Sequence, residues 1–307
     1  MTAMTNPRST TRKRILALDS GAGGLSIIES LRALSYHRSV AIELDFVADS
    51  ACYPYGEKSK TQLDERISQL VEDALRHKAY DIIIIACNTA STQVLETLRA
   101  QTDIPIVGVV PAIKPSAEQS ETKAVIVLAT ESTVDSVYLD LLCDQFAADI
   151  DITRIAAPEL VSAAELYVAT EDLTDLKSLQ KVEQAVDLVL DKTQSNVLRK
   201  QRDSSAPTPD CIVLACTHFP LLRNILREKM VQYPALKKAK LIDSGHAVAM
   251  RVVDLLKLPV EKGAEPDGDS VQTPEFLVDI SVTGDTNLAK DKRKTYLDYL
   301  NRRLDIK

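Results

Sequence analysis

Two cysteines of this 307-residue chain stand where a thiol can do chemistry. Cys87 and Cys216 occupy matching places in two similar segments, DIIIIACNT (81–89) and DCIVLACTH (210–218). Each segment predicts a buried strand that ends at the cysteine and is followed by a helix, whose N-terminus favours a thiolate. An unperturbed thiol has a pKa of about 8.5, so a modest depression makes it a base near neutral pH. A buried structural cysteine is the alternative for either thiol taken alone.

Polar residues follow both cysteines directly. Asn88 and Thr89 come after the first, and Thr217 and His218 after the second. Helix N-termini bind carboxylates, so these side chains are candidates for holding an acidic ligand, although Asn and Thr there can also be simple helix caps. His218 is either a hydrogen-bonded core residue or a group that polarises the neighbouring thiol, and the pairing with cysteine favours the second interpretation.

A third candidate group ends the first predicted strand. Asp19 and Ser20 precede a glycine-rich turn and offer an acceptor and a hydroxyl suited to a substrate ammonium, or ordinary turn chemistry. The turn is a weak dinucleotide signal, since the third glycine of that fingerprint falls at Ser26 and Asp19 would repel a pyrophosphate. Further along, Tyr55 and Gly56 follow a proline in a loop that could close over a ligand or be a plain surface turn.

Short apolar segments alternate with amphipathic ones along the chain, which predicts an α/β fold of mainly parallel sheets flanked by helices. The echo between the two cysteine segments, and a second echo between LDSG (18–21) and IDSG (242–245), suggests two similar domains. Three segments are predicted to lie outside the regular elements: a flexible leader, a polar loop or insertion, and an acidic loop, at residues 1–13, 193–209 and 261–273. The strands are predicted within 15–18, 41–49, 81–89, 105–110, 123–130, 150–157, 211–217 and 240–245.

Composition excludes several classes of function. With 37 basic against 44 acidic side chains and 4% aromatics, the chain is a poor candidate for binding nucleic acid. Its most apolar stretch, residues 82–86, is far shorter than the roughly 20 residues that cross a bilayer, so no membrane partner is expected. Five cysteines without a CxxC pair and four scattered histidines predict neither disulfides nor a metal site. The chain is predicted to be cytoplasmic.

Taken together, these residues resemble the cofactor-independent aspartate/glutamate racemase family, from Leu18 to about Gly284. The resemblance implies an amino-acid racemase (an isomerase) that interconverts L- and D-glutamate without cofactor and supplies D-glutamate for peptidoglycan. The Thr-His pair after the second cysteine points to glutamate, with aspartate as the rival substrate. The matching motifs are DSGAGGLS (19–26), PYG (54–56), ACNTAS (86–91), GVVPAIKP (108–115) and CTHFPLL (216–222).

The resemblance also implies an arrangement of the site. Two α/β domains face each other across a cleft, residues 14–110 plus 225–307 forming the first and the inserted residues 111–224 the second. The cysteines lie on opposite walls, with Cys87 removing the proton from D-glutamate and Cys216 from L-glutamate. A homodimer is left open. Substrate binding falls to Asp19, Ser20, Tyr55, Gly56, Asn88, Thr89, Thr217 and His218, with Thr130 and Glu165 in support.

Two other classes of function compete with this hypothesis. A cysteine hydrolase or transferase would use Cys216 as nucleophile and His218 as base, but it leaves Cys87 unexplained. A catalytically inactive binding protein on the same scaffold would not need either thiol. Inverting an amino-acid α-carbon does need both, because a base must act on one face and an acid on the other.

Overall fold

The chain forms two parallel sheets in a computed structural model that describes residues 12–38, 40–170, 175–258 and 275–304. The predicted α/β class is confirmed, and each of the eight predicted strands is present. The first sheet has the order β4-β3-β1-β2-β9, with β4 Ile106–Gly108, β3 Ile82–Ile85, β1 Lys13–Asp19, β2 Ile42–Ala48 and β9 Phe276–Val282. The second has the order β6-β5-β7-β8, with β6 Asp151–Ala156, β5 Ala124–Ala129, β7 Cys211–Leu214 and β8 Lys240–Ile242.

Helices cover both faces of the first sheet, which explains why its central strands are apolar at every position. Along β1, Ile15 and Ala17 face one core, whereas Leu16 and Leu18 face the other. The first core is closed by α1 (Gly24–Arg38), α10 (Gly245–Leu256) and α11 (Thr286–Leu304). The second is closed by α2 (Lys60–His77) and α3 (Asn88–Gln101).

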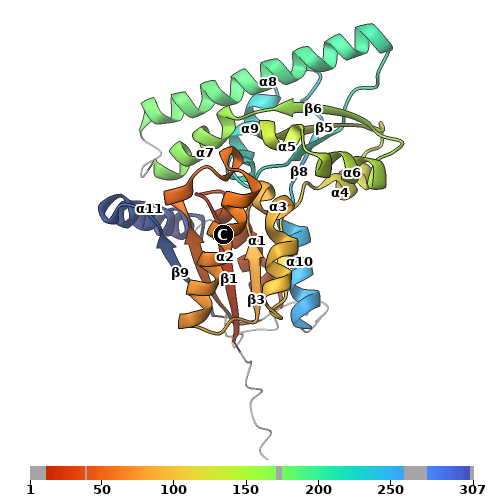
Figure 1. Cartoon of the computed structure of the whole chain (residues 1–307). Coiled ribbons are helices and arrows are strands. Elements are labelled where there is room, and N and C mark those ends of the chain that lie inside the picture. Colours follow the sequence, from red (N-terminus) through yellow and green to blue (C-terminus); the bar gives the residue numbers. More distant parts are fainter. Residues whose placement is uncertain (1–11, 39, 171–174, 259–274, 305–307) are drawn as a thin grey trace, which may run out of the picture.

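The second sheet is covered in the same way. One face packs against α4 (Ile113–Gln119) and α6 (Val137–Phe146). The other packs against α7 (Glu159–Ala169), α8 (Leu176–Ser204) and α9 (Arg223–Met230), and α8 runs along the outside of this domain (Figure 1). Buried residues on that face are continuous with the α1 face of the first sheet, so one apolar core joins the two domains.

Two sequence predictions about the second domain are corrected. Residues 193–204 are not a loop, because they form the last part of α8, where Thr193 and Val197 are buried. The segment is polar because the rest of its surface faces water. The first domain also does not resume at residue 225, since β8 pairs with β7 in the second sheet and the chain returns only after Ile242.

The last strand of the first sheet was not predicted. β9 pairs in parallel with β2 although it comes more than 220 residues later in the sequence, and its Leu277, Asp279 and Ser281 are exposed. An edge strand with one solvent-exposed face lacks the continuous run of apolar residues by which the other strands are recognised. The predicted leader lies largely, and the acidic loop at 261–273 wholly, outside the described residues.

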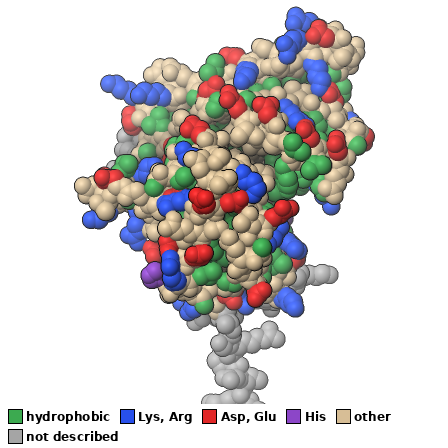
Figure 2. All heavy atoms as spheres, viewed as in Figure 1, with side chains coloured by type: hydrophobic (Ala, Val, Ile, Leu, Met, Phe, Trp, Pro, Cys, Tyr) green, Lys and Arg blue, Asp and Glu red, His purple; other side chains and the backbone are tan. Residues whose placement is uncertain are grey.

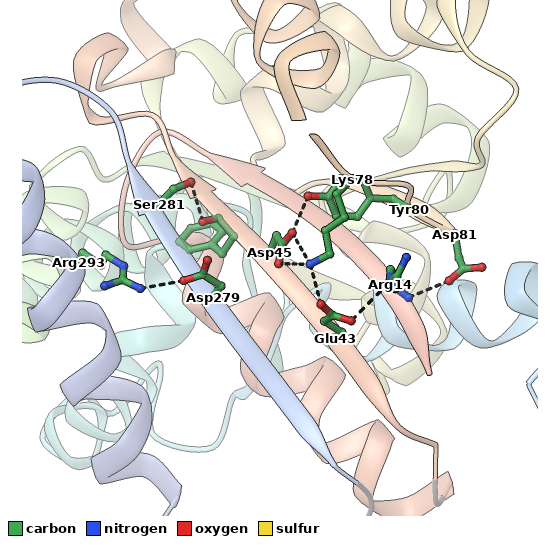
Figure 3. Close-up of polar contacts among 10 residues, drawn as sticks. Arg14, Glu43, Asp45, Lys78, Tyr80, Asp81, Asp279, Ser281 and Arg293 are labelled. Atoms are coloured by element: carbon green, nitrogen blue, oxygen red, sulfur yellow. Dashed lines mark hydrogen bonds and ion pairs between the residues drawn. The ribbon is translucent and has the colours of Figure 1, made fainter. Parts of the chain in front are cut away.

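On the face seen in Figure 2, Lys and Arg side chains are interspersed with Asp and Glu. A groove of about 660 Å³ follows β2, β9 and the end of α2. Along it, Lys78 pairs with Glu43 and Asp45 at 2.8 and 2.7 Å, and Arg293 of α11 pairs with Asp279 (Figure 3). None of the helices in the described ranges is long and apolar enough to span a membrane.

Candidate active site

The predicted site residues gather where the two domains meet. Asp19 ends β1 and Cys87 follows β3 in the first domain, and Cys216 follows β7 in the second. Direct bonds join the two walls: the Thr217 hydroxyl donates to Asp19 Oδ2 at 3.1 Å, and Ser26 Oγ of α1 donates to the Thr217 carbonyl at 2.9 Å. The carboxyl ends of strands from both sheets therefore meet at one interface, as expected for ligand sites in parallel α/β sheets.

A chain of three polar groups leads to the Cys216 thiol. His218 Nδ1 lies 3.8 Å from Cys216 Sγ, and His218 Nε2 lies 2.9 Å from Glu165 Oε1. Glu165 comes from α7, and its Oε1 also accepts the backbone N–H of Ala22 at 2.7 Å from the first domain. This arrangement of a thiol, an imidazole and a carboxylate can hold a positive charge beside Cys216 and so favour its thiolate.

The charges of His218 and Glu165 stabilise each other. Burial by itself lowers the pKa of His218, but hydrogen bonds to Cys216 and Glu165 outweigh it and hold that pKa well above the usual value. Burial likewise raises the pKa of Glu165, yet the hydrogen bond and charge of His218 bring it below the usual value. The pair is thus an ion pair at neutral pH, and the imidazolium faces the thiol.

Cys87 has a different environment from the one predicted. Burial, followed by the nearby Asp19 carboxylate, raises the pKa of the Cys87 thiol well above its usual value, and the backbone N–H groups of Thr89 and Ala90 only partly oppose this. The helix N-terminus is present, since Cys87 is the N-cap of α3, but burial dominates. The charge of Cys216, which follows β7 on the opposite wall, also contributes to the raised pKa of Cys87.

The helix predicted to follow Cys216 and its two polar neighbours is present, but it is a short 3₁₀ helix. A turn at Thr217 and His218 leads into a 3₁₀ helix, η3 (Phe219–Leu222), and α9 begins only at Arg223. The positive group next to Cys216 is therefore the His218 side chain rather than a helix N-terminus.

Asp19 is a buried carboxyl within this cluster. Its Oδ1 accepts the Ser20 N–H at 2.6 Å, and it is 1% exposed. Burial raises the pKa of Asp19 to about 6, against the favourable effects of His218, Ser20 and Thr217. Because burial disfavours the charged form of Asp19, a cationic partner would stabilise its carboxylate, and a ligand ammonium group would supply one.

Asn88 offers the cluster an unused acceptor. Its side chain is buried, and its Oδ1 has no hydrogen-bond partner among the described residues. A buried polar atom without a partner costs about 1–3 kcal/mol, which a bound donor would recover. Ser20, directly after β1, and Thr89, next to Asn88 in the first turn of α3, are buried as well.

The loop with Tyr55 and Gly56 adjoins the site, with Tyr55 in the first-domain core and Gly56 toward the second domain. Tyr55 is 1% exposed, and its hydroxyl donates to Asp49 Oδ2 at 3.0 Å, so its ring belongs to the first-domain core. Arg66 donates to both oxygens of Asp49, at 2.9 and 2.5 Å, and the Thr283 hydroxyl donates to Oδ1 at 2.5 Å. Gly56 faces the second domain, where a Cβ would come within 3.6 Å of the Ser132 hydroxyl.

Of the two supporting residues, Glu165 joins the cluster and Thr130 is placed at its edge. Thr130 caps α5 (Glu131–Val134), and its hydroxyl bonds Ser132 and Thr133 at 3.2 and 3.1 Å. The helix α5 in turn lies against η2 (Tyr55–Glu57) and α3. These contacts make Thr130 part of the rim opposite the Gly56 loop.

Three side chains at the site were missed by reasoning from the sequence. The Tyr53 ring lies edge-on to His218 with their centres 6.3 Å apart, and Ser26 makes the bond to Thr217 described above. Tyr296 of α11 donates to Glu165 Oε2 at 3.2 Å. Tyr53 adjoins a motif that was singled out, but nothing local marks Tyr296, which lies 131 residues from its partner.

Gly23 is required by the closeness of the two walls. A Cβ there would lie 2.5 Å from Thr217 Oγ1, 2.7 Å from His218 Nδ1 and 2.8 Å from Asp19 Oδ2. We expect Gly23→Ala to displace these groups and to lower enzymatic turnover by about 10²-fold, the usual effect of a 1 Å misplacement. Steady-state kinetics measure this, with Ala33→Ser on the exposed side of α1 as control. Unchanged turnover in Gly23→Ala would show that the walls do not meet this closely.

In the part of the chain that the structure describes, no three His, Cys, Asp or Glu side chains gather as a metal site. The cluster instead offers two thiols, one imidazolium ion pair and one buried carboxyl, which together can move protons at a centre held between the domains.

Comparison with known proteins agrees with this chemistry. The family model for Asp/Glu/hydantoin racemases matches residues 25–252. Glutamate racemase of Shewanella sp. strain ANA-3 is 38% identical over 242 residues, covering 79% of this chain and 78% of that protein. The one from Vibrio cholerae is 36% identical over 252 residues, covering 82% and 84%. The crystal structure of Escherichia coli glutamate racemase with L-glutamate and the activator UDP-MurNAc-Ala has a TM-score of 0.70 and 32% identity, covering 94% of this chain and 95% of that one.

Proposed function

Because the chain belongs to the Asp/Glu/hydantoin racemase family, we propose that it interconverts L- and D-glutamate by proton transfer between two cysteines. The observation that carries this proposal is the placement of Cys87 and Cys216 on the two walls of one interface. Each thiol lies near charged groups that can affect its ionisation. Among relatives, both the curated sequences and the Escherichia coli structure bear the name glutamate racemase. D-Glutamate made in this way would serve peptidoglycan synthesis in the cytoplasm.

The reaction needs a thiolate on one face of the α-carbon and a thiol on the other. In the L-to-D direction, the Cys216 thiolate takes the α-proton and the Cys87 thiol delivers a proton to the opposite face. In the D-to-L direction the roles are exchanged. The raised pKa of Cys87 suits the donor role, and the His218 imidazolium suits the thiolate role of Cys216. After each turnover the thiols exchange their protonation states and the other enantiomer becomes the substrate.

Substrate binding must also stabilise the carbanion that forms at the α-carbon. We assign the ammonium group to Asp19, whose buried carboxylate lacks a full cationic partner. We assign binding of the substrate carboxylates to the N–H groups and hydroxyls around Asn88, Thr89 and Thr217 at the ends of the strands. Donors fixed in this way before reaction can lower the barrier, because they need not reorganise as charge develops.

A cysteine hydrolase remains the second candidate, since Cys216, His218 and Glu165 form a nucleophile, base and carboxylate series. Such an enzyme has no use for a second thiol near the first. Loss of Cys87 therefore separates the two hypotheses: it abolishes racemisation but leaves a hydrolase active.

The proposal is tested by incubating the purified chain with L-glutamate, D-glutamate or L-aspartate in D₂O, without added cofactor, followed by chiral separation and mass spectrometry. We expect L- and D-glutamate to reach a 1:1 mixture, with deuterium at the α-carbon of the newly formed enantiomer. Exhaustive EDTA treatment and dialysis should leave the rate unchanged. Activity that is lost on dialysis and restored by a metal ion, or racemisation of aspartate alone, contradicts the proposal.

A further inference from the structure

The carboxyl-terminal helix α11 reaches the site from the first domain. It packs on β9 and α1 of its own domain and also on α7 of the second domain, which carries Glu165. Lys292 and Tyr296 lie four residues apart and so share a face of this helix. The Tyr296 hydroxyl donates to Glu165 Oε2 at 3.2 Å, and the charge of Lys292 helps to keep the Glu165 carboxyl ionised.

The two oxygens of Glu165 are held separately. Oε1 accepts from the Ala22 N–H at 2.7 Å and bonds His218 Nε2 at 2.9 Å. Oε2 accepts from Tyr296, which is only 2% exposed. Fixing both oxygens fixes the plane of the carboxylate, and that plane determines how Glu165 meets the imidazole. Two of the three bonds cross from the first domain to the second.

We propose that Tyr296 is a positioning residue for the Cys216 thiol: its hydroxyl holds the Glu165 carboxylate turned toward His218, so that the imidazole stays beside the sulfur. The catalytic consequence rests on the proposed racemase function, whereas the effect on the thiol does not. Tyr296 does not touch either cysteine, and it acts only through Glu165 and His218.

The physical reason is the cost of leaving a partly buried carboxylate oxygen without its hydrogen-bond donor. Without the hydroxyl, the proton shared by Glu165 and His218 shifts toward Glu165, and a neutral imidazole no longer favours a thiolate at Cys216. Tyr296→Phe retains the other titratable groups around these residues, which are Asp19 of β1, Tyr53 of the loop, Cys87 before α3 and Lys292 of α11.

The test is the pH dependence of Cys216 alkylation by iodoacetamide in Tyr296→Phe, measured by peptide mass spectrometry with fragmentation to separate Cys216 from Cys211. We expect alkylation at pH 7 to be about threefold to tenfold slower than in the unmodified chain, since a tenfold change corresponds to about 1.4 kcal/mol, within the cost of the lost bond. The whole profile should move to higher pH. Its position reports ionisation of the thiol, whereas a change of access alters only the plateau.

Tyr299→Phe is the matched control. Tyr299 is a buried tyrosine one turn further along α11, but its hydroxyl accepts from Arg303 Nε at 3.2 Å and it belongs to the Glu29 side of the helix. Its variant should keep the unmodified alkylation profile. Coincident profiles for Tyr296→Phe and the unmodified chain, or an equal shift in Tyr299→Phe, would overturn the proposal.

The kinetics give a second, separate readout. If the chain racemises glutamate, Tyr296→Phe should lower kcat and leave KM nearly unchanged, because Tyr296 stabilises the base and does not contact substrate. A higher KM with unchanged kcat would contradict the assignment. Alkylation needs no turnover, so the two proposals can fail separately. A chain without racemase activity refutes the proposed function, but a shifted alkylation profile still supports the role of Tyr296. An active chain with an unshifted alkylation profile refutes only the role of Tyr296.

Discussion

Replacing either Cys87 or Cys216 with alanine is expected to abolish the interconversion of L- and D-glutamate in both directions. Each direction needs one thiolate to remove the α-proton and one thiol to supply the new one, and a positioned proton-transfer group contributes about 10²- to 10⁴-fold in rate. Chiral analysis of the product from each pure enantiomer measures the loss. Cys143→Ala serves as control, because Cys143 is buried in α6 against the far face of the second sheet.

The single cysteine variants should still differ from each other. In D₂O, Cys87→Ala retains Cys216 and should exchange the α-proton of L-glutamate only, whereas Cys216→Ala should exchange that of D-glutamate only. This exchange carries information that steady-state rates do not, since the enantiomers have equal free energy and kcat/KM is the same in both directions for any variant. Exchange of the same enantiomer by both variants, or normal racemisation by Cys87→Ala, would rule out the two-thiol mechanism and favour the hydrolase.

His218→Asn is expected to have the next largest effect, a fall in kcat of about 10²-fold or more. His218 is held protonated by Glu165 and Cys216, so that its pKa lies well above 6.5 and its positive charge persists through neutral pH. Asparagine offers a donor without a charge, so Cys216 must ionise unaided. The acid limb of the pH–rate profile should therefore move to higher pH, and part of the lost activity should return as the pH rises.

The control for this prediction is His77→Asn, which changes an exposed histidine at the end of α2, where Nδ1 contacts the Asp73 carbonyl. It should leave both kcat and the pH profile unchanged. A His218→Asn variant with an unshifted acid limb would mean that the imidazolium does not govern ionisation of Cys216, and the charge next to this thiol would have to come from elsewhere.

The sequence by itself determined the strands β1 to β8 and the candidate thiols, because short local patterns of residues indicate both. Four consecutive isoleucines before Ala86 and Cys87 indicate a strand buried on both faces, and residues that follow such strands emerge at one edge of the sheet. The match between the segments ending at Cys87 and Cys216 pointed to two similar sheets, which are present. These inferences needed no contact between distant parts of the chain.

Only the tertiary structure decided what surrounds the thiols. Burial outweighs the helix N-terminus at Cys87, and burial depends on how the two domains pack rather than on the residues next to the cysteine. Glu165 acquires its partners Ala22 and Tyr296 from 143 and 131 residues away, through hydrogen bonds that no local spacing encodes. For the same reason the edge strand β9 and the end of α8 were missed: with one face in water, neither has a strongly apolar sequence, and each is held in place by the surface on which it packs.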